Sequence, residues 1–324
     1  MDCQLDQFII KLKCEVNQKY FNCKIKQENE HVTLIKAENS NGESIYLKKT
    51  KLIDLKGASF SKKLLSFKQL YSLDRFKEEE EKYMNEIIDT NRHLATEAFI
   101  YSNVLCNGSK YVVHHNSVFK PHVHQNIMCI ELAICGISLD DILLDMTAQE
   151  QILKRESIIK VTDNVLRGLQ FCHGLNVIHC DVKCSNVIFD PNKNVFCLCD
   201  FGMARVKPDR HCTVPHSSGV NPDTYQPPEI LLGRPFNEKV DIFSLGCMLS
   251  GIINWKETFT NIIDKIPYVQ RAEYVRTEVS TGECLTYLDD DVHFKTFIIS
   301  LLSYNHQDRP TASLALENLL VSFF

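Results

Sequence analysis

The feature that most constrains this chain is a polar run set between two short apolar segments. Residues 177–189 read Val-Ile-His-Cys-Asp-Val-Lys-Cys-Ser-Asn-Val-Ile-Phe, so β-favouring side chains flank the polar ones. A second apolar run, residues 195–199, is followed directly by Asp200, which lies nineteen positions after Asp181. We therefore expect four side chains to form one site rather than to be separate surface residues: Asp181, Lys183, Asn186 and Asp200.

The polar run resembles the catalytic loop of protein kinases, whose pattern is H-R-D-L-x-x-x-N. His179, Asp181 and Asn186 match it, and residues 200–202 match the family's D-F-G triplet. Each match alone is weak, but the loop, the interval and the triplet together are specific. The resemblance implies an α+β fold of two lobes, a small β-rich N-lobe and a larger, mainly helical C-lobe.

The resemblance assigns a role to each residue of the loop. Asp181 faces the incoming hydroxyl, while Asn186 and Asp200 hold Mg²⁺ against the phosphates of ATP. A lysine two positions after the aspartate, here Lys183, approaches the γ-phosphate in serine/threonine kinases. We therefore expect an ATP-dependent serine/threonine protein kinase with protein substrates, and the resemblance also leaves room for a regulatory protein partner.

Three segments continue the resemblance downstream. Residues 225–230 resemble the A-P-E segment, and residues 240–246 resemble the buried helix whose aspartate, here Asp241, supports the catalytic loop. Residues 306–312 resemble the segment whose arginine pairs with the A-P-E glutamate, which predicts an ion pair between Arg309 and Glu229. The wording around Glu229 is nearest to the cyclin-dependent and MAP kinase branch.

Upstream, residues 45–48, Ile-Tyr-Leu-Lys, resemble the V-A-I-K strand. The resemblance places Lys48 at the α- and β-phosphates, with Lys49 as the alternative. It makes Glu97 the helix glutamate that pairs with this lysine, and the acidic run at residues 78–81 competes for that role.

Residues 129–133, Cys-Ile-Glu-Leu-Ala, resemble the strand and hinge that hold adenine. Ile130 is then the gatekeeper, and the backbone groups of Glu131 and Ala133 hydrogen-bond the base. The resemblance adds Ile188 and Cys199 to the nucleotide pocket, with Cys199 bordering its floor.

The chain is strand-rich in its first third and helical after Ser138. Residues 20–52 predict an antiparallel meander with a turn at residues 39–42. Ile158, Val161, Val165 and Leu169 recur at helical spacing. We divide the chain into an N-terminal extension (1–19), an N-lobe (20–133) with an insertion near 53–90, and a C-lobe (134–324).

Two departures bear on nucleotide binding. The expected glycine-rich loop falls on residues 26–31, Lys-Gln-Glu-Asn-Glu-His, which contain no glycine to let backbone N–H groups close over phosphates. Tyr46 replaces a small alanine that faces adenine. We therefore expect weaker nucleotide binding, and a pseudokinase scaffold is the main alternative function; a small-molecule kinase fits the downstream segments less well.

Two further departures bear on regulation and acceptor choice. Cys180 replaces the arginine that receives an activation-loop phosphate, which predicts a kinase not switched in that way. Pro222 replaces a threonine that touches the catalytic aspartate and lysine. We nonetheless favour an active kinase, because the charged catalytic residues are all kept.

The composition bears on nucleic-acid binding, zinc binding, location and membrane insertion. A formal charge of -5 gives no basic face for nucleic acid. The 14 cysteines include no Cys-x-x-Cys pair, and the first residues are polar and acidic, so we expect reduced thiols, no structural zinc and a cytoplasmic or nuclear location. The longest apolar stretch, residues 240–253, contains Asp241 and Ser244 and predicts a buried helix rather than a membrane span.

Overall fold

The computed structural model describes residues 21–28, 32–39, 41–51, 96–97, 99–101, 105, 108–119, 127–133, 136–149, 151–207, 226–254, 270, 277 and 291–323. The predicted extension at 1–19, the insertion near 53–90, the acidic run at 78–81 and Pro222 lie outside these residues. The chain divides into two compact units, Met1–Cys106 with His114–Cys135, and Asn107–Val113 with Gly136–Phe324.

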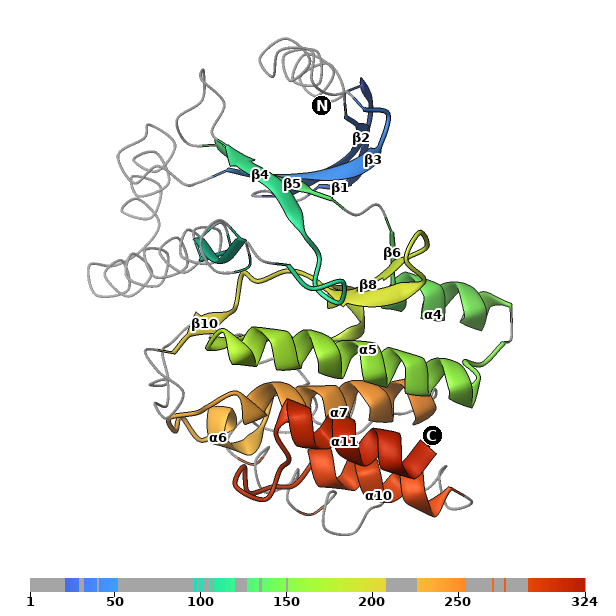
Figure 1. Ribbon diagram of the computed structural model, residues 1–324, viewed down its shortest axis with the longest axis vertical. Helices are drawn as coiled ribbons and strands as arrows, with labels where there is room; N and C mark the ends of the chain where they lie inside the picture. Colours follow the sequence, from blue (N-terminus) through green and yellow to red (C-terminus); the bar gives the residue numbers. More distant parts are fainter. Residues whose placement is uncertain are drawn as a thin grey trace, which may run out of the picture. The chain divides into compact units, whose positions relative to one another are not determined.

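The first unit is built on an antiparallel sheet (Figure 1). Its described strands are β1 (Phe21–Glu28), β2 (Val32–Glu38), β3 (Ser44–Lys51), β4 (His115–Phe119) and β5 (Ile127–Leu132), in the order β1-β2-β3-β5-β4. The first three form the predicted meander.

Strand periodicity explains the inner face of this sheet. Four alternating residues of β2 and β3 are each only 1% exposed: Ile35, Ala37, Ile45 and Leu47. The predicted turn between β2 and β3 is closed by the Asn39 side chain, whose Oδ1 accepts the backbone N–H of Asn41 and of Glu43. Gly42 follows with φ +78°, a conformation that glycine adopts without strain.

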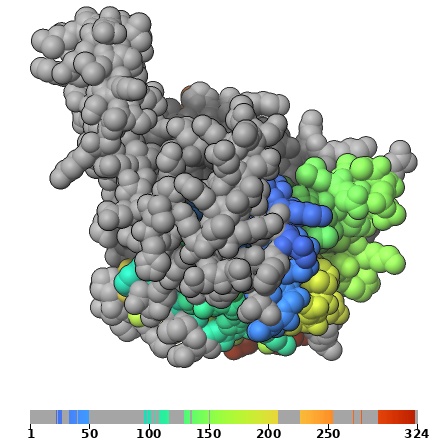
Figure 2. Space-filling model, turned by 90° about the horizontal axis from the view of Figure 1, so that it is seen from above, coloured from blue at the N-terminus to red at the C-terminus, as the bar shows by residue number. Residues whose placement is uncertain are grey.

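The second unit is mainly helical. Its described helices are α4 (Leu139–Ala148), α5 (Arg155–Gly174), α6 (Pro228–Leu231), α7 (Lys239–Asn254), α10 (Val292–Leu301) and α11 (Ala312–Phe323). The outer side of α4 reaches the surface (light green in Figure 2), where Leu144 is 63% exposed. No helix in the described part of the chain is long and apolar enough to cross a membrane.

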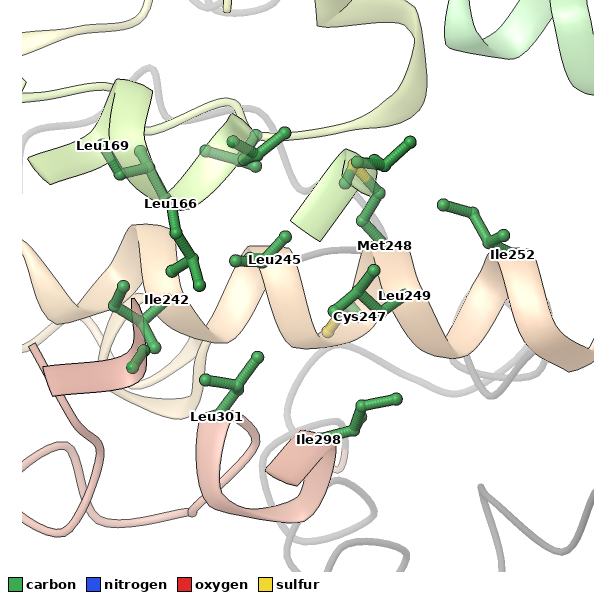
Figure 3. Packing of buried hydrophobic residues seen from close by; sticks show 14 of the residues in the cluster. Leu166, Leu169, Ile242, Leu245, Cys247, Met248, Leu249, Ile252, Ile298 and Leu301 are labelled. Atoms are coloured by element: carbon green, nitrogen blue, oxygen red, sulfur yellow. The ribbon is translucent and has the colours of Figure 1, made fainter. Parts of the chain in front are cut away.

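Helix α7 forms the centre of the helical core. Its side chains lie between Leu166 and Leu169 of α5 and Ile298 and Leu301 of α10 (Figure 3). Because α7 is apolar around most of its circumference, it is stable only when covered on several sides, which confirms the predicted buried helix. The absence of a side chain at Gly246 allows Leu302 to approach, since a Cβ there would lie 2.8 Å from Leu302 Cδ2.

Short strands of the second unit bracket the polar run. Strands β6 (Ile137–Ser138), β8 (Val187–Asp190) and β9 (Val195–Leu198) form one sheet, and β7 (Val177–Ile178) pairs with β10 (Arg205–Val206). The polar run therefore leaves β7, passes through the 3-10 turn η1 (Cys184–Asn186) and enters β8. This arrangement fixes both ends of the loop in paired strands.

Candidate active site

The backbone of the polar run is held by a buried carboxylate. Asp241 is fully buried near the start of α7, where its Oδ2 accepts the N–H of His179 and its Oδ1 that of Cys180, each at 2.8 Å. Cys180 has φ +63°, a left-handed conformation that favours glycine, and these bonds hold it there. The predicted support of the loop by Asp241 is present.

His173, which sequence reasoning did not single out, completes this support. Its Nε2 lies 2.8 Å from Asp241 Oδ2, and its ring is nearly buried in the last turn of α5. The available signal was its place at the end of a strongly periodic helix, six residues before His179. It orients the carboxylate that in turn orients the loop.

The His179 ring connects the loop to the residue before Asp200. Its Nδ1 accepts the N–H of Asp181 at 3.3 Å, which places the proton of the neutral ring on Nε2. Nε2 then donates to the Cys199 carbonyl oxygen at 3.0 Å. The ring also packs on Phe201, with centroids 4.8 Å apart.

The Asp181 carboxylate is oriented by two neighbouring side chains. Asn186 Nδ2 donates to its backbone oxygen at 2.8 Å and to Oδ2 at 2.7 Å, and Lys183 Nζ lies 3.0 Å from Oδ2. The side chain of Asp181 is 18% exposed, so a solvent-side molecule can still reach it. An oriented carboxylate beside a lysine can accept a proton and stabilise negative charge.

Asn186 and Asp200 fit a magnesium ion by the chemistry of their donors. Because the Asn186 amide nitrogen is used on Asp181, its Oδ1 is the atom turned to other partners. The N–H of Cys199 donates to the Asn186 carbonyl oxygen at 3.0 Å. Because Asp200 directly follows Cys199, this bond brings the backbone of Asp200 close to Asn186. Carboxylate and amide oxygens are ligands that Mg²⁺ accepts.

In the first unit, Lys48 and Glu97 form a buried ion pair. Lys48 Nζ lies 3.0 Å from Glu97 Oε1 and 2.8 Å from Oε2, and Glu97 is 1% exposed. Side chains alternate along β3, so Lys49 lies on the opposite face, with Ile45 and Leu47. The structure therefore pairs Glu97 with Lys48.

An ion pair between two residues far apart in the sequence was also expected in the second unit. Arg309 Nη1 and Nη2 lie 2.6 and 2.7 Å from the two carboxylate oxygens of Glu229, with both residues buried. The predicted pair between the 306–312 segment and the segment at 225–230 is confirmed.

Comparison with known proteins assigns the family. The model of the protein kinase domain matches residues 60–321, most of the chain. This chain belongs to the protein kinase family. Its two-lobed fold, with a β-sheet lobe and a helical lobe, is the kinase fold.

The relatives of this chain are kinases whose sequence identity to it is modest. The chain is similar to the mitogen-activated protein kinase HOG1 of Kluyveromyces lactis, at 32% identity over 42% of the chain and 31% of that protein. It is 30% identical to a putative serine/threonine-protein kinase of Acanthamoeba polyphaga mimivirus, over 64% of the chain and 38% of that protein. Human cyclin-dependent kinase 20 is 29% identical over 50% of the chain and 46% of that protein. The chain thus spans about a third to a half of these relatives' lengths.

The hinge of this kinase differs in one respect from the sequence expectation. Ile130 and Glu131 are buried, and Asn116 Nδ2 donates to Glu131 Oε1 at 3.0 Å. The N–H of Ala133 donates to the His114 carbonyl oxygen at 2.8 Å. In this structure the backbone donor expected to bind adenine is therefore already used.

Two further residues predicted for the nucleotide pocket, Ile188 and Cys199, lie on or next to the paired strands β8 and β9. Ile188 is half-buried in β8, while Cys199 is half-buried one residue beyond the end of β9. The nearby Cys197 is fully buried and donates its thiol to the Lys110 carbonyl oxygen at 3.1 Å. Both faces of β9 are covered, because all four of its residues are buried.

Cys180 stands in an apolar setting where the kinase pattern has arginine. It packs against a small cluster made of Ile178, Ile230, Phe236 and Val240. Burial raises the pKa of its thiol well above the usual value. Position 180 therefore offers neither a cation nor a thiolate.

Proposed function

We propose that this chain is an ATP- and Mg²⁺-dependent serine/threonine protein kinase that transfers the γ-phosphate to protein hydroxyls. The observation that carries the proposal is the Asp181 carboxylate, held by Asn186 and Lys183 on a loop whose backbone is fixed by Asp241. A phosphoryl-transfer site needs mainly such positioning and charge neutralisation. The names of the relatives, which include serine/threonine kinases, agree with it.

The proposal gives each side chain one task. Asp181 accepts the proton of the substrate hydroxyl while the hydroxyl oxygen forms a bond to the γ-phosphorus. The bond between the γ-phosphorus and the oxygen of the β-phosphate breaks, and ADP is released. Lys183 balances charge on the transferred group. Asn186 and Asp200 would hold Mg²⁺, which neutralises phosphate charge when bound.

Further residues are proposed to contact the nucleotide. Lys48, oriented by Glu97, would bind the α- and β-phosphates. Ile130 would lie against the adenine, and the Glu131 carbonyl oxygen would accept a hydrogen bond from it. In the second unit, Ile188 and Cys199 are the residues proposed for the nucleotide pocket. Ala133 can serve as the second backbone contact only if its N–H leaves His114.

The hydrogen bond from the Ala133 N–H to the His114 carbonyl oxygen favours a second candidate function, a pseudokinase scaffold. An occupied Ala133 N–H, a glycine-free segment at residues 26–31 and Tyr46 in β3 each weaken nucleotide binding. A binding scaffold needs the fold but no phosphate transfer. The two functions differ in whether Mg-ATP is bound and turned over.

The test is transfer of labelled γ-phosphate from Mg-ATP to a generic basic protein. We expect transfer by the wild type, and losses of roughly a hundredfold or more in Asp181→Asn and in Asp200→Ala, because each removes a group that acts at the reacting phosphate. Arg155→Met, which alters an ion pair with Asp291 at 2.6 Å on the surface, is the matched control and should stay active.

A thermal shift separates the two functions. Mg-ATP should raise the melting temperature of the wild type, and more so after Gln27→Gly and Glu30→Gly, because a ligand that binds only the folded state stabilises it. Transfer that survives Asp181→Asn would contradict the kinase proposal. No thermal shift in any variant, together with no transfer, would establish the scaffold.

A further inference from the structure

The chain after the D-F-G triplet is held close to the catalytic loop by a second set of contacts. Strand β10 pairs with β7, with Arg205 opposite Ile178 and Val206 opposite Val177. The N–H of Lys207 then donates to the Asn176 carbonyl oxygen at 2.8 Å. The residues that enter the catalytic loop and the residues 204–207 therefore share one short ladder.

At the end of this ladder lies an ion pair between a buried lysine and a partly exposed glutamate. Lys207 is only 4% exposed, and its Nζ lies 2.5 Å from Glu238 Oε2. Burial, the largest single effect, favours the neutral form of Glu238. The hydrogen bond from Lys207, a backbone hydrogen bond and the charges of Lys207 and His173 together outweigh burial and leave the pKa of this carboxyl below its usual value. A lysine this buried is uncommon unless its charge is matched, so the pair is a defined contact rather than a solvated one.

Glu238 connects the pair to the support of the catalytic loop. It directly precedes α7, and three residues later Asp241 accepts the N–H groups of His179 and Cys180. The same end of α7 thus holds the catalytic loop through Asp241 and the residues after the triplet through Glu238. The side chain of Cys180, which lies between them, packs against an apolar cluster and carries no positive charge.

We propose that Lys207 is a positioning residue, and that its ion pair with Glu238 anchors residues 204–207 to α7 in place of a phosphate held by a cation at position 180. The proposal rests on the proposed function for its effect on catalysis. Its physical content, a charge-matched anchor built into the chain, stands on the contacts alone. Such an anchor needs no modification to form, because the chain itself supplies both side chains.

The experiment compares Lys207→Met, Glu238→Gln and the double variant with the wild type. Backbone hydrogen exchange is measured by mass spectrometry on peptides covering residues 176–182 and 203–207, and on α11 as a reference. We expect exchange in the first two peptides to rise on the order of tenfold in both single variants, with α11 unchanged, because a local contact is lost. The double variant should be no worse than the single ones, since the two residues act as a pair.

Activity gives the second readout. We expect kcat to fall roughly tenfold in each single variant, because the loop that carries Asp181 loses part of its positioning. Lys207→Arg, which keeps the charge, should recover at least half of the loss, and Arg155→Met should stay within about twofold as the control for a surface pair.

Three results would overturn the inference. They are unchanged exchange at residues 176–182 and 203–207, a rise in exchange that is equal in α11, and losses that add in the double variant. If the wild type transfers no phosphate, the proposed function fails, and the exchange measurement alone still decides whether the anchor exists.

Discussion

Cys199 is partly exposed, whereas Cys129, Cys184 and Cys197 are buried. Burial raises the pKa of Cys129, Cys184 and Cys197 to about 12, so these thiols are almost wholly protonated at neutral pH. Cys199 is half-buried and directly precedes Asp200. We expect an alkylating reagent to modify Cys199 faster than Cys197, and Mg-ATP to slow it, because the proposed nucleotide covers this position.

The measurement is labelling with iodoacetamide at mildly alkaline pH, with and without Mg-ATP, followed by peptide mapping. Cys197, two residues away with its thiol donated to Lys110, is the internal control. Equal labelling of Cys199 in both conditions, or faster labelling of Cys180 or Cys184, would place the pocket floor elsewhere.

Among the elements, the turn before α11 is tied to α6 by one side chain. Arg309 makes two bonds to Glu229, donates to the Ser303 and Tyr304 carbonyls, and lies over the Phe243 ring with its guanidinium carbon 4.9 Å from the centroid. Arg309→Met leaves a buried, unmatched carboxylate, so we expect the free energy of unfolding to fall by about 3–5 kcal/mol. Urea denaturation measures this change.

The control for Arg309 is the pair between Arg155 and Asp291, whose side chains are 47% and 25% exposed. Arg155→Met should cost at most about 1 kcal/mol, because exposed ion pairs contribute little. Arg309→Lys should also destabilise, since an ammonium cannot reproduce two parallel bonds. A loss for Arg309→Met as small as that for Arg155→Met would refute the assigned role.

For the whole molecule, the main expectation concerns regulation. The candidate acceptors for phosphorylation between residues 203 and 224 are Thr213, Ser217 and Ser218, which lie outside the described residues. A phosphate there would need a cation to bind, and Cys180 instead packs in an apolar cluster. We therefore expect phosphatase treatment to leave the transfer rate within about twofold.

Mass spectrometry before and after treatment verifies that phosphate has been removed. The variant with alanine at all three acceptors should match the treated protein. A treated sample that loses nearly all of its activity would show that a phosphate at another contact is required.

Local sequence patterns were sufficient to predict several helices and the candidate site residues of this protein. The roles proposed for Asp181, Lys183 and Asn186 come from one short run, because residues this close in sequence are held by a single loop whichever way the rest of the chain folds. Helices α5 and α7 were predicted because apolar spacing follows the geometry of the helix itself. The resemblance of residues 240–246 to the buried helix of protein kinases likewise predicted that Asp241 supports the loop.

Only the tertiary structure decided contacts between distant residues. Lys48 and Lys49 are neighbours in sequence, and Lys48 is the one that meets Glu97 because strand alternation and packing turn it to that face. The bond from Ala133 to His114 joins backbone groups, which carry no side-chain signal at all. The pair of Lys207 with Glu238 depends on how β10 lies beside β7 and where α7 begins, and two ordinary charged residues do not reveal their burial until the chain has folded around them.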